Sequence, residues 1–462
     1  MNRDADGTRW IFIWYLALFV WAPIPLGSNR PWSWALLEFW VFLLALWWLA
    51  GVIRGRFDCG PILRGAWPML ACAALWLGYV WLQLVPLPVG LLERLSPEAA
   101  RWHIAAASEA MAAAPLTLDR YATLEAACKS TAYVVFFALS LALLGNRDRI
   151  RIATYVLVIS GLLQAWYGAV DALRNFNGAA SGTFVNRNHY AAYLVMCLSV
   201  GIGVLVASLS GKNSESWGWW LRSVAQWIIT PKMALRLALL VMVIALVLTR
   251  SRMGNSSFFI SLLAAGLIGL ALSRRATKSM VILFASLIAI DLLVVGTYFG
   301  TQRVVERIAQ TTAETEDRGE VAGYAFRMWT DFPVFGSGLG SFPVVFPRYS
   351  AEATVGTYTH AHNDYLEFAG ETGVVGISLL GLLVFTSFLA ALRAQIVRRD
   401  RLMRGISFGA IMAIIALGIH STVDFNLQIP ANALTFTLLL AFAWISLYHR
   451  NRDESHYDDR RA

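Results

Sequence analysis

Long apolar runs separated by short polar segments dominate the pattern along the chain. Each run approaches the roughly 20 residues that a helix needs to cross the hydrocarbon core of a bilayer. The pattern therefore predicts an all-α polytopic membrane protein with about twelve transmembrane helices. The predicted spans lie near residues 10–26, 33–53, 68–89, 131–145, 152–173, 190–210, 236–249, 257–273, 279–299, 373–392, 405–423 and 429–448.

Composition narrows the class of protein. Hydrophobic residues make up 58% of the chain and charged residues only 15%, with a mean hydropathy of +0.57, which excludes an ordinary soluble domain. The first apolar run has no small-residue cleavage site after it, so we expect a retained span rather than a signal peptide. The four cysteines show no metal-ligand spacing, which favours packing roles over a disulfide framework.

The positions of lysine and arginine predict the orientation. With the N-terminus in the cytoplasm, the cytoplasmic connections and both tails hold about 24 of the 38 Lys and Arg residues, as the positive-inside rule expects. Topology and contact with anionic lipids then explain the net charge of +9. No basic soluble face is evident, so nucleic acid is not an expected partner.

This topology divides the chain into four regions. Residues 1–299 hold spans one to nine with short loops, and residues 300–372 form a large helical loop on the periplasmic side. Residues 373–448 hold spans ten to twelve, and residues 449–462 form a cytoplasmic tail.

Three arginines lie at span ends on the predicted outer side. Arg187 precedes the sixth span, and Arg250 and Arg252 lie in the short connection between the seventh and eighth spans. Outward-facing cations held at span ends indicate an anionic ligand at the outer leaflet. The alternative is that they only extend toward phospholipid headgroups.

A polar cluster precedes the tenth span. His360 and His362 could be ordinary surface histidines, or they could form part of a metal site with Asp364 or Glu367, but no clear third ligand of matching type follows. We therefore expect no metal. The sequence DYLE predicts a capping box, with Asp364 at the N-cap and Glu367 three residues later. His362 then lies just before a helix N-terminus, where the helix dipole disfavours the imidazolium.

The segment HNDYLEFAGETGVVG resembles the histidine motif of the bacterial O-antigen ligase and polymerase family. His362, Asn363, Gly373 and Gly376 occupy the fixed positions of that motif. Other parts are similar to the family as well: Asn186 and Asn188 in an F-x-N-x-N stretch, the Ser251–Arg252 pair, and PVFGSGLGSF at 333–342.

The resemblance implies an inverting glycosyltransferase of a bacterial inner membrane that needs no cofactor. Such an enzyme moves a glycan en bloc from undecaprenyl pyrophosphate to an acceptor sugar at the periplasmic face. The implied acceptor is lipid A-core for a ligase or a growing polysaccharide for a polymerase. We favour the ligase; the polymerase, then transfer to a protein, then a non-enzymatic lipid-linked glycan transporter are the alternatives.

The resemblance also implies roles for individual residues. His362 would take the proton from the acceptor hydroxyl, and Arg187 and Arg252 would hold the pyrophosphate leaving group. Gly373 and Gly376 would allow tight packing where the loop enters the membrane. The expected substrate-binding residues are Arg250, Asn186, Asn188, His360, Asn363 and Glu367.

Two further stretches have simpler interpretations. Residues 96–120 predict an alanine-rich amphipathic helix on the outer surface, with acceptor docking as the alternative role. Residues 420–430 place His420 and Asp424 at an outer span end. Buried polar packing is the favoured role for this pair, and support of the site or acceptor binding is the alternative.

Overall fold

The protein is described from a computed structural model that covers residues 8–58, 60–107, 111–174, 178–208, 231–272, 319–350 and 358–449. Within these ranges, eight helices are long and apolar enough to cross a membrane. They are α3 (Pro31–Ile53), α8 (Arg120–Leu143), α9 (Arg147–Arg174), α10 (Arg187–Ser208), α13 (Arg252–Leu272), α17 (Asp364–Val397), α18 (Arg401–His420) and α19 (Pro430–Tyr448).

Three shorter apolar helices accompany them: α2 (Arg9–Trp21), α5 (Trp67–Leu82) and α12 (Pro231–Leu248). The only strands in the described ranges are β1 (Leu87–Pro88) and β2 (Ala113–Ala114), which pair antiparallel. The prediction of an all-α, multi-pass membrane protein is therefore confirmed. The predicted span near 279–299 lies outside the described residues, so the count of twelve stays a prediction.

Two helices extend beyond the predicted spans, for one reason, and one predicted helix is shorter than expected. α8 begins at Arg120, whereas its predicted span begins near 131, and α17 begins at Asp364, whereas its predicted span begins near 373. In both, polar turns precede the apolar stretch, and a hydropathy pattern detects only the apolar part. The single helix expected over 96–120 ends at Ala106 as α7 (Pro97–Ala106), and the chain then forms β2 just before Pro115.

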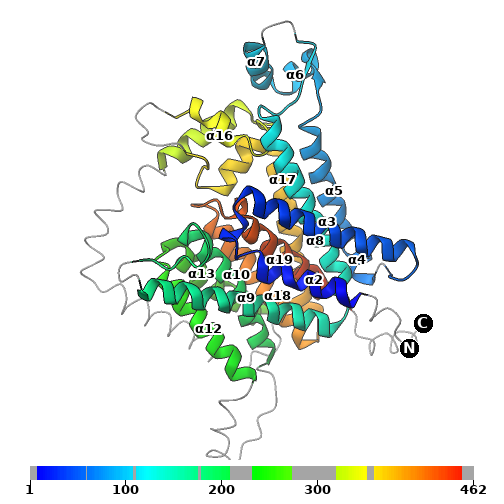
Figure 1. Ribbon diagram of the computed structural model, residues 1–462, viewed down its shortest axis with the longest axis vertical. Coiled ribbons are helices and arrows are strands. Elements are labelled where there is room, and N and C mark those ends of the chain that lie inside the picture. The colour runs from blue at the N-terminus through cyan, green and yellow to red at the C-terminus, as the bar shows by residue number, and fades with distance from the viewer. Residues whose placement is uncertain are drawn as a thin grey trace, which may run out of the picture.

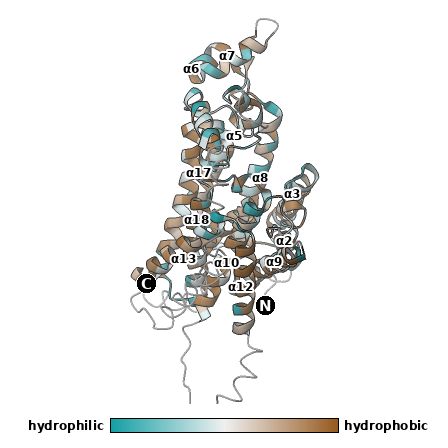
Figure 2. Cartoon of the chain, turned by 90° about the vertical axis from the view of Figure 1, so that its left-hand side faces the viewer, coloured by the Kyte–Doolittle hydropathy of each residue, from teal (hydrophilic) through white to brown (hydrophobic). Residues whose placement is uncertain are grey.

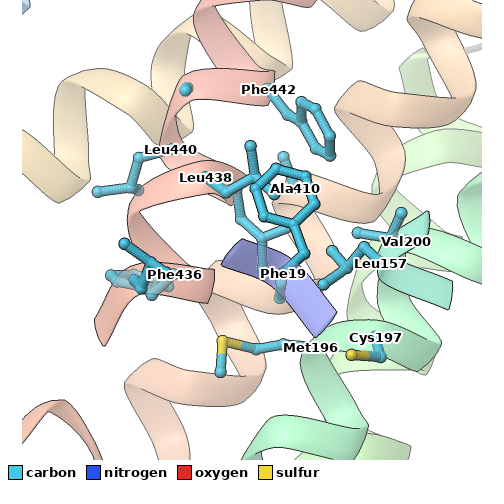
Figure 3. Packing of buried hydrophobic residues seen from close by; sticks show 14 of the residues in the cluster. Phe19, Leu157, Met196, Cys197, Val200, Ala410, Phe436, Leu438, Leu440 and Phe442 are labelled. Carbon is cyan, nitrogen blue, oxygen red and sulfur yellow. The ribbon is translucent and has the colours of Figure 1, made fainter. Parts of the chain in front are cut away.

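The centre of the bundle is built from α10, α18 and α19. In the most apolar stretch of each, the buried share of residues is 83% in α10, 78% in α18 and 89% in α19. The corresponding share is only 22% in α3 and 28% in α17, which lie at the periphery. α10 and α18 approach at Gly203 and Gly405, where an added Cβ on either would meet the backbone oxygen of the other. Phe19, Met196 and Phe442 help to fill the surrounding core (Figure 3).

The described parts of the six connections predicted on the outer side lie together at one end of the bundle; these connections are 27–32, 90–130, 174–189, 250–256, 300–372 and 424–428. Contacts join them to one another: Gly27 with Phe184 and Ile429, Ala180 with Leu248, Leu118 with Ser337, and Asp364 with Ser421. We call this the histidine end because it carries His362. At the opposite end Arg147 pairs with Asp400, and Arg149 donates a hydrogen bond to Thr8. Which end faces the cytoplasm stays a prediction.

A small second core stands at the histidine end. We call residues 87–107, 111–118 and 319–350 the cap. It includes α6 (Val89–Leu95), α7, the strand pair, the helical residues 319–331, and α16 (Phe342–Val345). α6 and α7 lie beyond the ends of α5 and α8 (Figure 1). Hydrophobic residues predominate along α17 and α18 (Figure 2). Ala361, between His360 and His362, packs into the cap core, so the cap positions the histidine segment directly.

Candidate active site

The histidine segment, residues 358–363, ends at the N-cap of α17. The N-cap is Asn363, whose Oδ1 accepts a hydrogen bond from the Leu366 N–H at 3.1 Å. The predicted capping box was therefore wrong, because it placed the N-cap one residue too late, at Asp364. Both residue types cap helices well, so composition alone does not choose between them. The shift leaves the carboxylates of Asp364 and Glu367 available for other contacts.

Glu367 fixes the backbone and side chain around His360. Its side chain is 2% exposed; one carboxylate oxygen accepts the Ala361 N–H at 2.8 Å, and the other lies 2.7 Å from His360 Nδ1. Burial alone would lower the pKa of His360, but the nearby Glu367 carboxylate outweighs burial and raises it. The contact with Glu367 therefore favours the protonated form of His360.

Asp364 joins the histidine segment to the connection between α18 and α19, residues 421–429. The Ser421 hydroxyl donates to Asp364 Oδ2 at 2.6 Å, and the Asp364 N–H donates to the Ser421 carbonyl at 3.0 Å. The Leu427 N–H also points at this carboxylate, at 3.3 Å. Two segments distant in sequence are thus fixed to each other at the histidine end.

His362 faces a buried carboxylate in that connection. Its Nδ1 lies 3.6 Å from Asp424 Oδ1, and His189 Nε2, from the first turn of α10, lies 3.3 Å from the same oxygen. Asp424 is fully buried. Burial alone would raise the pKa of Asp424, but His189 and His362 together hold it well below its usual range. His362 itself has a left-handed backbone, with φ of 51°.

The ring of Phe425 packs among three imidazoles. His360 stacks on it at 4.1 Å between ring centroids, and His362 and His189 meet its edge at 4.9 and 4.5 Å. Sequence reasoning missed His189 and Phe425 and favoured a packing role for Asp424. The available signal was His189 in NRNHY, two residues after Arg187, but nothing in the sequence connects that stretch to residue 424.

The three predicted arginines lie at or next to the N-termini of α10 and α13. Arg187 and Arg252 are the first residues of these helices, and both are exposed; Arg250 precedes α13 with φ of 55°. The first turns pack closely, because a Cβ on Gly254 would meet Ala191. The N-termini of two helices, where the helix dipoles are positive, therefore lie close together, with the three arginines in or beside their first turns.

Asn186 and Asn188 shape the turn that leads into α10. Asn186 Oδ1 accepts the Asn188 N–H at 2.8 Å, and the Asn186 carbonyl accepts the Tyr190 N–H at 3.1 Å. These bonds set the direction of α10 and hence the place of Arg187. Their predicted role in substrate binding stays a prediction.

Gly373 produces a break inside α17, with φ of 60° and ψ of −168°. At this point the helix lies against the backbone of Val334, and Gly376 packs against Tyr79, whose hydroxyl donates to the Thr372 carbonyl at 2.6 Å. A side chain at Gly373 would collide with the Val334 backbone. Gly373 therefore allows α17 to lie against the backbone of residues 334–335, and Gly376 allows it to lie against α5.

No group of three or more histidine, cysteine, aspartate or glutamate side chains within the described ranges is arranged to hold a metal ion. His360 and His362 instead face separate carboxylates, Glu367 and Asp424. The arrangement matches that of a general base oriented by a carboxylate, placed near a cationic region.

Residues 237–381 match the family model described as O-antigen ligase. The matched segment covers 145 of the 462 residues and supports the O-antigen ligase family. The ligase segment contains Arg250, Arg252 and the whole histidine motif, whereas α10 and the 421–429 connection lie outside it. A comparison with curated proteins gives no match. The family supports ligase- or polymerase-type glycosyl transfer, with lipid-linked glycans and polysaccharides as substrates in the membrane.

Proposed function

We propose that the protein is an O-antigen ligase of a bacterial inner membrane. It transfers a glycan from undecaprenyl pyrophosphate to an acceptor sugar of lipid A-core at the periplasmic face, with inversion at the anomeric carbon. The observation that carries the proposal is the pairing of His362 with buried Asp424 beside the arginine-bearing starts of α10 and α13.

His362 acts as the general base. Its Nδ1 faces the Asp424 carboxylate at 3.6 Å, which favours a proton on Nδ1 and leaves the Nε2 lone pair to accept the proton of the acceptor hydroxyl. The hydroxyl oxygen forms the new bond to the anomeric carbon, and the bond from that carbon to the pyrophosphate oxygen breaks. The electron pair leaves with the pyrophosphate, and the Asp424 carboxylate stabilises the imidazolium that forms.

The cationic region of α10 and α13 stabilises the departing pyrophosphate. Arg187 and Arg252 offer planar, permanently charged donors, and the helix N-termini add the positive ends of their dipoles. These groups supply the positive charge that a divalent metal provides in many phosphate enzymes. We therefore expect a chelator to leave transfer unchanged.

The proposal is tested with the purified protein in liposomes, given undecaprenyl pyrophosphate bearing a short glycan and a lipid A-core acceptor. His362→Ala should abolish transfer and retain binding of undecaprenyl pyrophosphate, whereas His360→Ala should do less. Full turnover by His362→Ala, or equal losses in both variants, would contradict the base assignment.

A deletion strain separates the related activities. Loss of all glycan from lipid A-core, with polymer still built on the carrier lipid, supports the ligase. Cores that carry a single repeat unit would indicate the polymerase, and polymer that never reaches the periplasm would indicate a transporter.

A further inference from the structure

We infer that His189 is a positioning residue for this transfer, holding the Asp424 carboxylate in place for His362 from the side of α10. The inference rests on the proposed function. His189 lies outside both the histidine motif and the segment that matches the ligase family. Its contacts, and not its place in any motif, carry the argument.

His189 is held rigidly. The residue is 3% exposed, and its ring meets the edge of Phe425 at 4.5 Å between centroids. Its main-chain carbonyl accepts a hydrogen bond from Asn432 Nδ2 at 3.1 Å, which ties the first turn of α10 to α19. An imidazole that served only as packing would not need to meet a buried carboxylate at 3.3 Å.

The two imidazoles converge on one oxygen atom. Asp424 Oδ1 lies 3.3 Å from His189 Nε2, 3.6 Å from His362 Nδ1, and accepts the N–H of Phe425 at 3.0 Å. A fully buried carboxylate needs such donors, because it has no water to replace them. His189 and the Phe425 N–H fix the oxygen, and His362 approaches it from a remaining direction.

Loss of the His189 donor has a chemical consequence beyond loosened packing. Fewer polar groups would then offset the negative charge of the Asp424 carboxylate, which would therefore attract a protonated His362 more strongly. The acid limb of the pH–rate profile should therefore move to higher pH. The other ionisable groups that face Asp424 are His420 at the end of α18 and Asp364 at the start of α17, and both stay in place.

Three variants test the inference in the liposome assay. His189→Leu removes the donor, His189→Gln places an amide N–H near the position of Nε2, and His103→Gln alters a cap histidine that contacts the Thr117 carbonyl instead. We expect His189→Leu to lower turnover about 10- to 100-fold, the loss typical of one polar contact with a charged group. His189→Gln should recover most of it, and His103→Gln should match the wild type.

Binding and pH dependence separate positioning from a merely structural role. Because Arg187 begins the same helix, affinity for undecaprenyl pyrophosphate is measured for each variant. Positioning predicts unchanged affinity, a shifted acid limb, and no further loss when His189→Leu is added to Asp424→Asn. Weakened affinity with an unchanged pH profile would overturn the inference, as would equal losses in His189→Leu and His189→Gln. An active wild type with a fully active His189→Leu contradicts this inference alone, whereas an inactive wild type contradicts the proposed function as well.

Discussion

Replacing Asp424 by asparagine tests the centre of the proposed mechanism. Asparagine keeps the size of the side chain and an oxygen for the Phe425 N–H, but it removes the charge that faces His362. Two unit charges 3.6 Å apart interact by about 4.6 kcal/mol at an effective dielectric constant of about 20. In Asp424→Asn this attraction no longer stabilises the imidazolium that forms when His362 takes the proton. The activation barrier of transfer then rises by up to this amount, and transfer slows by up to about 10³-fold.

The measurement is single-turnover transfer in liposomes, so that product release does not mask the chemical step. Asp400→Asn is the matched control, because Asp400 is also an aspartate paired with a cation, Arg147, but at the opposite end of the bundle. Asparagine also keeps the N-cap of α18 that Asp400 provides. Transfer by Asp424→Asn within threefold of the wild type, with both variants folded, would refute the role of Asp424.

Three further changes probe other parts of the site. Arg252→Lys should insert normally yet lose about 10²- to 10³-fold in transfer normalised to protein level, because lysine lacks the planar fork; near-normal transfer would assign this arginine to headgroup contact. Burial lowers the pKa of His360, but Glu367 raises it by more. The pair therefore stabilises the folded state fully below about pH 6.5, and this stabilisation is lost as the pH rises through the raised pKa of His360. The wild-type Tm should fall across that interval, and an equal fall in Glu367→Gln would contradict the pairing. Gly373→Ala should destabilise the protein by about 1–3 kcal/mol in denaturant titrations, since φ of 60° with ψ of −168° suits glycine alone; unchanged stability would argue against the break in α17.

Much of the fold could be predicted because hydropathy reports directly on the apolar stretch of each span. It could not report the polar first turns of α8 and α17, whose lengths are set by capping at Asp119 and Asn363. The positions of the arginines at helix ends followed from the same alternation of spans, and the structure places them at the histidine end.

The partner of His362 could not be predicted, for a physical reason. Asp424 and His189 reach it from a connection and a helix far away in the sequence, and only the packing of α10 against α18 and α19 brings them together. Local pattern carries no information on such contacts. The same holds for Phe425, which looks like any apolar residue near a span end until its ring is seen among three imidazoles.

The glycine contact between α10 and α18 limits how this protein could be re-engineered. At Gly203 and Gly405 the two helices meet backbone to backbone, with no side chain between them to adjust. The helix that begins with Arg187 and the helix that leads into the Asp424 connection therefore keep a fixed separation. A chimera that exchanges only one of the two with a relative would change this separation and move the pyrophosphate region away from the base. Exchanges between relatives should therefore take α10 and α18 together from a single parent.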